Sequence, residues 1–239
     1  SAANAELMRH WLLKRLLDGV PLCAIALLPV AALADASIDS QRQALVQQAV
    51  ESGKWDTSIM SLRSLYERTG NVSVRSDLIA LLIRAERFEE ALSVCADCYP
   101  AEFTSHELLD LGGAARRQGE LDLALEFFTT LTHREPEEPA AWLGQALVYV
   151  DQGRYVLAES TLKRHEILAG PTLEAMEVRG YLAAETNDAL AELQARQALV
   201  ERQPERVNEI RALYRLAVGL GASEPARELL DRHPDLFNA

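Results

Sequence analysis

Small residues recur along the chain at a nearly constant spacing, between apolar positions arranged as on amphipathic helices. Gly112, Ala146 and Gly180 follow one another at equal intervals. A second series recurs at one or two such intervals, and its members are Ser58, Ala91, Ala124, Ala158 and Ala226. A constant period of about 34 residues is typical of a protein built from repeated supersecondary units.

The unit with the clearest pattern covers residues 142–162. It places a large residue first, a small residue four positions later, and an aromatic residue three positions beyond that. A glycine, a second aromatic and a second small residue follow; the landmarks are Trp142, Ala146, Tyr149, Gly153, Tyr155 and Ala158. This order resembles the tetratricopeptide repeat (TPR). The resemblance implies that each unit is a pair of antiparallel helices whose apolar face is covered by stacking on its neighbours.

We therefore expect an all-α, TPR-type helix-hairpin solenoid of about six repeats in a right-handed superhelix, covering residues 37–239. Glycines that can end a helix lie between the expected helices at Gly53, Gly119, Gly153 and Gly221. Leu236 and Phe237 follow the last helix without an evident packing partner, so we expect further repeats or another domain after residue 239. The helix pairs are expected near residues 39–69, 73–99, 105–134, 139–168, 172–202 and 206–233.

The start of the chain has the organisation of a secretory signal. We interpret residues 1–7 as a remnant of cloning and residues 8–36 as a signal peptide. A basic start is followed by an apolar run over residues 20–33 and by small residues that allow cleavage after Ala34 or Ala36. An uncleaved membrane anchor is the weaker alternative, because the run is shorter than the roughly 20 residues that a membrane-spanning helix needs. The sequence thus predicts export beyond the inner membrane.

Composition narrows the range of functions. The chain contains 39 Leu and 36 Ala among 239 residues, and only 6% of its residues are aromatic, which favours helices over a β-sandwich or barrel. Its apolar fraction of 49% is ample for a core and excludes general disorder. The formal net charge of −12 argues against indiscriminate binding of nucleic acid, since phosphate is repelled.

The sequence contains no pattern of a catalytic, metal or cofactor site. Phosphate-binding glycine loops and the common hydrolase and metalloprotease motifs are missing. Cys95 and Cys98 form a C-x-x-C motif without strands or further ligands around it, so we interpret them as small core residues or a local disulfide rather than a redox or metal site. His165 and His233 share a repeat position that is Leu131 and Leu199 in other units, which favours packing over ligation. We predict no enzymatic activity and no cofactor.

The first helix of each unit lines the concave face of a TPR superhelix, so its exposed positions are the candidate binding site. Units three and six contribute basic and polar residues, among them Arg116, Arg117, Asn208, Arg211 and Arg215. The acidic part of the candidate site comprises Asp151, Glu174, Glu177, Tyr181 and Glu185. Such a groove suits an extended cationic or mixed-charge ligand. The alternative is a solvated face whose charges are incidental.

The final stretch, residues 220–237, carries a more specific resemblance. Its turn Leu220-Gly221-Ala222-Ser223-Glu224-Pro225 and its ending His233-Pro234-Asp235-Leu236-Phe237 are similar to the periplasmic TPR region of outer-membrane exporters of poly-N-acetylglucosamine, a biofilm polysaccharide. The resemblance implies a periplasmic TPR arm tethered to the outer membrane by a β-barrel that follows residue 239. It also implies a polysaccharide deacetylase as partner and a partly deacetylated, cationic polymer as ligand.

Two further functions fit the same residues. One is a periplasmic adaptor that binds proteins during assembly of the outer membrane or of an envelope complex. The other is a scaffold in an exporter of a different exopolysaccharide. Peptide binding without a response to sugar would favour the adaptor.

Overall fold

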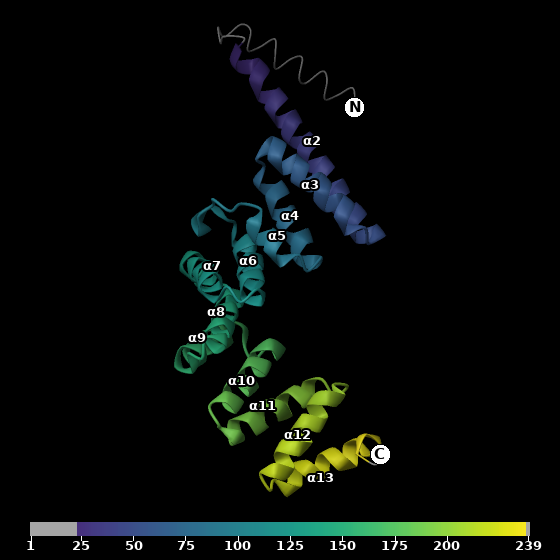
Figure 1. Ribbon diagram of the computed structural model, residues 1–239, viewed down its shortest axis with the longest axis vertical. Coiled ribbons are helices and arrows are strands. Elements are labelled where there is room, and N and C mark those ends of the chain that lie inside the picture. Colours follow the sequence, from purple (N-terminus) through teal and green to yellow (C-terminus); the bar gives the residue numbers. More distant parts are fainter. Residues whose placement is uncertain (1–22, 238–239) are drawn as a thin grey trace, which may run out of the picture. The chain divides into compact units, whose positions relative to one another are not determined.

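The computed structural model describes residues 23–237, with side chains from residue 36 onward. The described residues form twelve α-helices and two short 3-10 turns, and they contain no strand (Figure 1). The prediction of an all-α fold is thereby confirmed. The chain divides into two compact units, residues 1–81 and 82–239, which are considered in turn.

The first unit is built around a helix hairpin, α2 (Cys23–Ser52) and α3 (Trp55–Thr69), followed by most of α4 (Val72–Arg84). Ala49 of α2 is fully buried, as is Leu62 of α3. The guanidinium of Arg42 donates from Nη1 to Oδ2 of Asp77 at 2.7 Å and so ties α2 to α4.

The second unit contains α5 (Phe88–Ser93) and four successive helix pairs. These are α6 (Ser105–Arg117) with α7 (Leu121–Arg134), α8 (Pro139–Asp151) with α9 (Tyr155–Ala169), α10 (Leu173–Glu185) with α11 (Ala189–Arg202), and α12 (Val207–Gly219) with α13 (Ser223–Arg232). The 3-10 turns η1 (Pro100–Glu102) and η2 (Pro234–Leu236) precede α6 and follow α13. The division of residues 37–239 into six repeats stays a prediction.

The core of the second unit is shared between neighbouring repeats. One apolar cluster joins Ala146 of α8 and Leu162 of α9 to Val178 and Leu182 of α10. Another joins α11, α12 and α13 through residues that include Leu193, Ile210 and Leu229. Neighbouring helix pairs thus bury their apolar faces against each other, which is the behaviour expected of a solenoid.

Turns between the two helices of a repeat use the left-handed backbone conformation. Gly119, Gly153 and Gly221 have φ values of 80°, 69° and 69°. Two repeats have no glycine at this position, and there Glu86 and Asn187 adopt φ values of 59° and 58°. Asparagine tolerates this region better than most residues, whereas a glutamate there is uncommon.

Leu236 and Phe237, for which the sequence offered no partner, do have one in the structure. The ring of Phe237 packs on Tyr214 of α12, with ring centroids 4.5 Å apart, and Leu236 joins the same apolar cluster. The chain after α13 therefore folds back onto the last helix pair.

Residues 8–22 of the predicted signal peptide, like residues 1–7, lie outside the described residues. Its last part, residues 23–36, belongs to α2, so this helix begins well before residue 39, where the first repeat was expected to begin. Among the described residues, no helix has both the length and the apolar character needed to cross a membrane. Cleavage after Ala34 or Ala36 stays a prediction.

Candidate functional site

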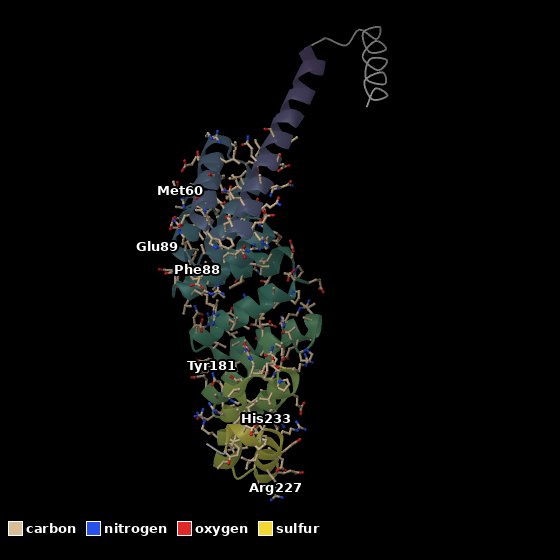
Figure 2. The ribbon with its side chains drawn as sticks, turned by 90° about the vertical axis from the view of Figure 1, so that its right-hand side faces the viewer. Met60, Phe88, Glu89, Tyr181, Arg227 and His233 are labelled. Atoms are coloured by element: carbon tan, nitrogen blue, oxygen red, sulfur yellow. A yellow bond between two sulfur atoms is a disulfide. The ribbon has the colours of Figure 1, made fainter. Side chains whose placement is uncertain are left out.

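The first helices of the repeats in the second unit, α6, α8, α10 and α12, carry the candidate binding residues. We call the surface formed by their exposed side chains the A-helix face. Ion pairs between residues about one repeat apart link α6 to α8 and α10 to the start of α12, as set out below. Tyr181 of α10, half exposed, stands at the surface of the molecule (Figure 2).

Asp151, at the end of α8, is bound by Arg116 of the preceding repeat. Its carboxylate accepts from Arg116 Nε at 2.6 Å and, through its other oxygen, from Nη2 at 3.4 Å. Such a two-point contact fixes the guanidinium more firmly than a single exposed ion pair does. The acidic charge predicted at Asp151 is therefore largely balanced by a neighbour on the same face.

Glu185, at the end of α10, is the centre of a small group with two tyrosines. The hydroxyl of Tyr155, at the start of α9, donates to Glu185 Oε2 at 3.0 Å. The negative charge of Glu185 raises the pKa of Tyr181 above its ordinary value, with a smaller contribution from Asp151. The hydrogen bond to Glu185 likewise raises the pKa of Tyr155. The structure thus brings together three predicted site residues, Asp151, Tyr181 and Glu185.

Glu177 and Tyr181 line an open groove of about 370 Å³ between α10, α11 and the start of α12. Glu177 is paired with Arg206, the residue just before α12. On the other wall, Arg196 of α11 contacts Glu192 at 2.8 Å and Glu209 of α12 at 2.9 Å. Apolar and small residues complete the lining, namely Met176, Gly180, Ala184, Ala195 and Leu199. The groove therefore combines both signs of charge with an exposed aromatic ring.

The remaining predicted residues are placed on the same helices but apart from this groove. Glu174, Asn208 and Arg211 do not line it. Arg117 lies over the ring of Phe88, with its guanidinium carbon 5.2 Å from the ring centroid. These positions remain candidates for contact with a ligand that extends beyond the groove.

Sequence reasoning missed three participants: Tyr155, Arg196 and Arg206. Tyr155 is one of the aromatic landmarks of the repeat pattern, and its ring packs beside the cluster of α8, α9 and α10 while its hydroxyl reaches Glu185. Arg206 lies in a turn and Arg196 on a second helix, so neither falls on the first-helix positions from which candidates were taken. The separation of Arg196 and Arg206 from Glu177 along the sequence does not indicate that the three side chains line one groove.

Cysteine and histidine residues also have defined places. Cys95 and Cys98 form a disulfide that closes the turn after the short helix α5. His165 of α9 is buried and hydrogen-bonded at both ring nitrogens, to the carbonyl of Pro139 at 2.8 Å and to the hydroxyl of Thr172 at 3.1 Å. Within the described part of the chain, no group of three or more His, Cys, Asp or Glu side chains is arranged to hold a metal ion.

Comparison with known proteins agrees with this architecture. Residues 109–171 match the sequence model of the tetratricopeptide repeat family. No curated protein sequence matches the chain.

Solved structures of TPR proteins are similar over most of the chain. A tetratricopeptide repeat protein from Parabacteroides merdae has a TM-score of 0.64 at 16% identity, with 81% of this chain and 79% of that protein covered. PilF of Pseudomonas aeruginosa has a TM-score of 0.60 at 14% identity, over 85% and 95%. MamA of Desulfovibrio magneticus RS-1, from residue 41 to its end, has a TM-score of 0.57 at 18% identity, over 70% and 95%. These likenesses show that the fold is that of a TPR solenoid.

Proposed function

We propose that this chain is a non-enzymatic scaffold of the bacterial periplasm, tethered to the outer membrane, that binds an extended cationic or mixed-charge ligand along its A-helix face. The ligand is partly deacetylated poly-N-acetylglucosamine, the polysaccharide deacetylase, or both. The single observation that carries the proposal is the open groove between α10, α11 and α12, which is lined by Glu177 and Tyr181.

The arrangement of charges on the A-helix face favours a ligand that carries positive charges only at intervals, and it is less suited to a polymer that is positively charged throughout. Glu177 is paired with Arg206 and Asp151 with Arg116, so the face offers carboxylates whose charge is partly balanced. Partly deacetylated poly-N-acetylglucosamine carries free amines among neutral N-acetyl groups and hydroxyls. Amines can replace an arginine partner, hydroxyls can bond to either sign of charge, and the exposed ring of Tyr181 offers an apolar face to a sugar ring.

The proposal assigns no catalytic step to the chain. A solenoid presents a long surface whose contacts are spread over several repeats, an arrangement suited to holding a polymer or an extended segment. The resemblance of residues 220–237 to the exporters of this polysaccharide supports the choice of ligand and of location.

Titration of the full chain with soluble oligomers tests the proposal. Partly deacetylated oligomers should bind, and fully N-acetylated oligomers of the same length should bind at least fivefold more weakly. Replacing Glu174 by Ala should weaken binding by up to about fivefold, in line with the energy of one exposed charge pair. Raising the salt concentration from about 0.15 M to 1 M should weaken it further, because the screening length falls from about 8 Å to about 3 Å.

Glu177 allows a sharper version of the same experiment. Glu177→Ala leaves the positive charge of Arg206 without its partner, so it should weaken binding of a cationic oligomer more than Glu174→Ala does. The double variant Glu177→Ala with Arg206→Ala should recover part of the loss. Glu201→Ala, on an exposed position of the second helix α11, serves as the matched control. Equal binding by Glu174→Ala, Glu177→Ala and Glu201→Ala contradicts the assignment of the face.

A protein-binding adaptor of the periplasm is the second candidate. The alternation of ion pairs along the face, Arg116 with Asp151 and Arg206 with Glu177, favours it, since a polypeptide also carries both signs of charge. In that case extended peptides would bind in the groove, and oligomers of either acetylation state would not.

A further inference from the structure

The second helices of the repeats differ at one position in a way that the fold does not require. In α3, α5, α7 and α13 the second residue is acidic, namely Asp56, Glu89, Asp122 and Glu224. A negative side chain in the first turn is favoured by the helix dipole. In the two adjacent repeats that contain α9 and α11, this position is instead Val156 and Leu190.

Both aliphatic side chains are exposed. Val156 is 85% exposed and Leu190 is 64% exposed. Single exposed aliphatic residues are common on protein surfaces and need no explanation. Here, however, the two exposed residues occupy equivalent positions in successive repeats, where the other repeats place charges, and an open cleft is lined by residues from both helix starts.

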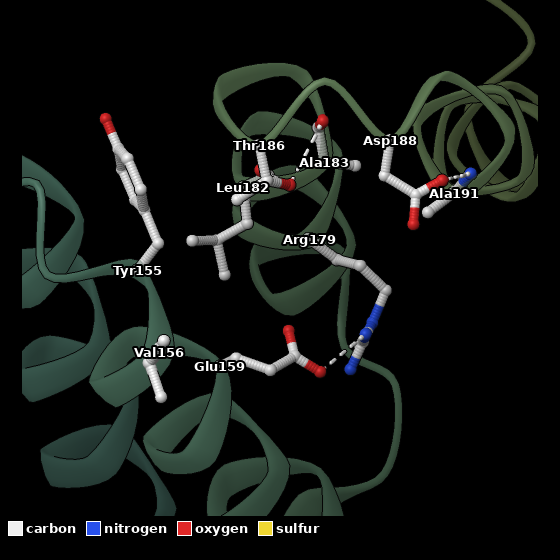
Figure 3. A pocket seen from close by; sticks show the side chains of 9 residues that line it. All are labelled: Tyr155, Val156, Glu159, Arg179, Leu182, Ala183, Thr186, Asp188 and Ala191. Atoms are coloured by element: carbon white, nitrogen blue, oxygen red, sulfur yellow. Dashed lines mark hydrogen bonds and ion pairs between the residues drawn. The ribbon is translucent and has the colours of Figure 1, made fainter.

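The cleft has a volume of about 390 Å³ and lies between the start of α9, the middle and end of α10, and the start of α11 (Figure 3). Val156 lines one side and Ala191 lines the side formed by α11. Leu190 is the sequence neighbour of Ala191 and lies at the edge of the cleft, outside its lining. Leu182 and Ala183 of α10, both almost fully buried, contribute further apolar surface. This volume is at the small end of the range for ligand pockets and suits a single large apolar side chain.

Charged groups around the cleft are mainly negative. Glu159 and Asp188 line it, and Figure 3 shows the dashed contact from Glu159 to the one cation of the lining, Arg179. That guanidinium is already held by two carboxylates, with 3.4 Å from Nη1 to Glu159 and 2.5 Å from Nη2 to Glu166. Asp188 caps α11 through one oxygen, which accepts from the backbone N–H of Ala191 at 3.0 Å. Glu159 is also paired with Lys163 of α9 at 3.4 Å. The charged residues of the lining, Glu159, Asp188 and Arg179, therefore leave one excess negative charge, which Asp188 supplies.

We propose that this cleft is a protein-docking site, separate from the groove lined by Glu177 and Tyr181, for a partner segment that presents an aliphatic or aromatic side chain next to Lys or Arg. The apolar side chain enters between Val156 and Ala191, and the neighbouring cation faces Glu159 and Asp188. Tyr155 lines the cleft as well as bonding to Glu185, so variants of Tyr155 and Glu185 are avoided in the test.

Three matched synthetic peptides provide the probes, used with the full chain in fluorescence anisotropy. The first contains Leu flanked by Lys, the second has Glu in place of Lys, and the third has Ser in place of Leu. The Lys–Leu peptide should bind at least tenfold more tightly than the other two. The double variant Val156→Glu with Leu190→Glu should lower its affinity at least tenfold, although the added negative charges by themselves attract a cationic peptide.

The substitutions are chosen so that folding is retained, because glutamate or aspartate already occupies this position in four other repeats. Ile167→Glu is the matched control: Ile167 is 75% exposed on the same helix α9, does not line the cleft, and corresponds to Glu201 in the next repeat. It should leave affinity unchanged within twofold. Tyr181→Ala, on the A-helix face, should also leave peptide binding unchanged.

Three results would overturn the proposal. One is undiminished binding of the Lys–Leu peptide to the Val156→Glu, Leu190→Glu variant. Another is equal binding of the Glu–Leu peptide, which would remove the charge argument. The third is self-association of the chain in sedimentation velocity that the double variant abolishes, since the occupant would then be a second copy of this chain.

Discussion

At the scale of single residues, His165 shows how a polar side chain can occupy a position that is leucine in other repeats. Its Nδ1 lies 2.8 Å from the carbonyl oxygen of Pro139, so Nδ1 carries the hydrogen and donates. Its Nε2 then accepts from the hydroxyl of Thr172 at 3.1 Å, and Thr172 in turn caps α10 by accepting from the N–H of Ala175. The ring therefore links the starts of α8 and α10.

We expect His165→Leu to lower the free energy of unfolding by about 1–3 kcal/mol, because it leaves the Pro139 carbonyl and the Thr172 hydroxyl without their partner in a buried place. Urea denaturation measures this change. His233→Leu is the comparison, since His233 shares the repeat position but is only half-buried after α13; a change within about 0.5 kcal/mol is expected there. A stabilised His165→Leu protein would show that the linkage contributes little.

The two tyrosines near Glu185 provide a second test at this scale. A nearby carboxylate disfavours tyrosinate, so both should ionise at a higher pH than the ordinary pKa of 10.0. For Tyr181 the charge of Glu185 is the main cause, whereas for Tyr155 it is the hydrogen bond. Glu185→Gln removes the charge but retains an acceptor, and it should therefore lower the pKa of Tyr181 more completely than that of Tyr155.

Site-resolved NMR of the tyrosine ring carbons during a pH titration measures both values. An unchanged pKa of Tyr181 in Glu185→Gln would contradict the assignment of Glu185 as the main cause of the raised pKa.

At the scale of elements, the stacking of one repeat on the next depends on close contact between the ring of a phenylalanine and two glycines of neighbouring helices. Phe128 of α7 is buried between Gly112 of α6 and Gly144 of α8. A Cβ atom added at Gly112 would lie 2.8 Å from a carbon of this ring, and one at Gly144 would lie closer still. Glycine at these two positions allows α6 and α8 to approach the same ring from the two repeats.

Gly144→Ala is expected to destabilise the protein by up to about 2 kcal/mol in thermal or urea unfolding. Overpacking of this kind costs about 1–3 kcal/mol, which exceeds the roughly 1 kcal/mol gained when alanine replaces glycine within a helix. Gly113→Ala is the matched control, because its Cβ would meet only the far end of the Arg117 side chain, at 3.8 Å. It should stabilise by up to about 1 kcal/mol, and equal effects of the two substitutions would contradict this account of the packing.

The helices themselves follow directly from the sequence, and their turns follow only in part. Gly119, Gly153 and Gly221 mark turns because glycine adopts positive φ without strain. Asn187 takes the same conformation with only the weak signal that asparagine gives, and Glu86 takes it with none, since the packing of the flanking helices fixes the turn and the residue adapts. The pairing of Phe237 with Tyr214 was not predicted either, because the expected continuation of the solenoid left Phe237 for a later repeat.

At the scale of the whole molecule, the repeat period determined the fold, while the contacts between repeats determined the site. The constant period is a property of the sequence, so an all-α TPR solenoid could be predicted from it. The pairs Arg116 with Asp151 and Arg206 with Glu177 join residues of different repeats, through side chains whose reach depends on the three-dimensional spacing of helices. Counting acidic residues on first helices therefore overstated the free negative charge of the face.

The second unit has two surfaces with different chemistry. The A-helix face carries balanced charges and an exposed tyrosine, while the cleft at the starts of α9 and α11 is apolar with acidic edges. We expect a polymer to use the first and a protein segment to use the second. Tyr155 touches both, through its hydroxyl and its ring respectively.

The assignment of the A-helix face as the ligand-binding surface is tested most directly by mapping bound oligomer on the full chain. Partly deacetylated poly-N-acetylglucosamine oligomers should shift the NMR signals of Glu177, Tyr181 and Glu185, and should leave those of Val156 and Leu190 unchanged. No shift on α10, or shifts confined to Val156 and Leu190, would contradict the account.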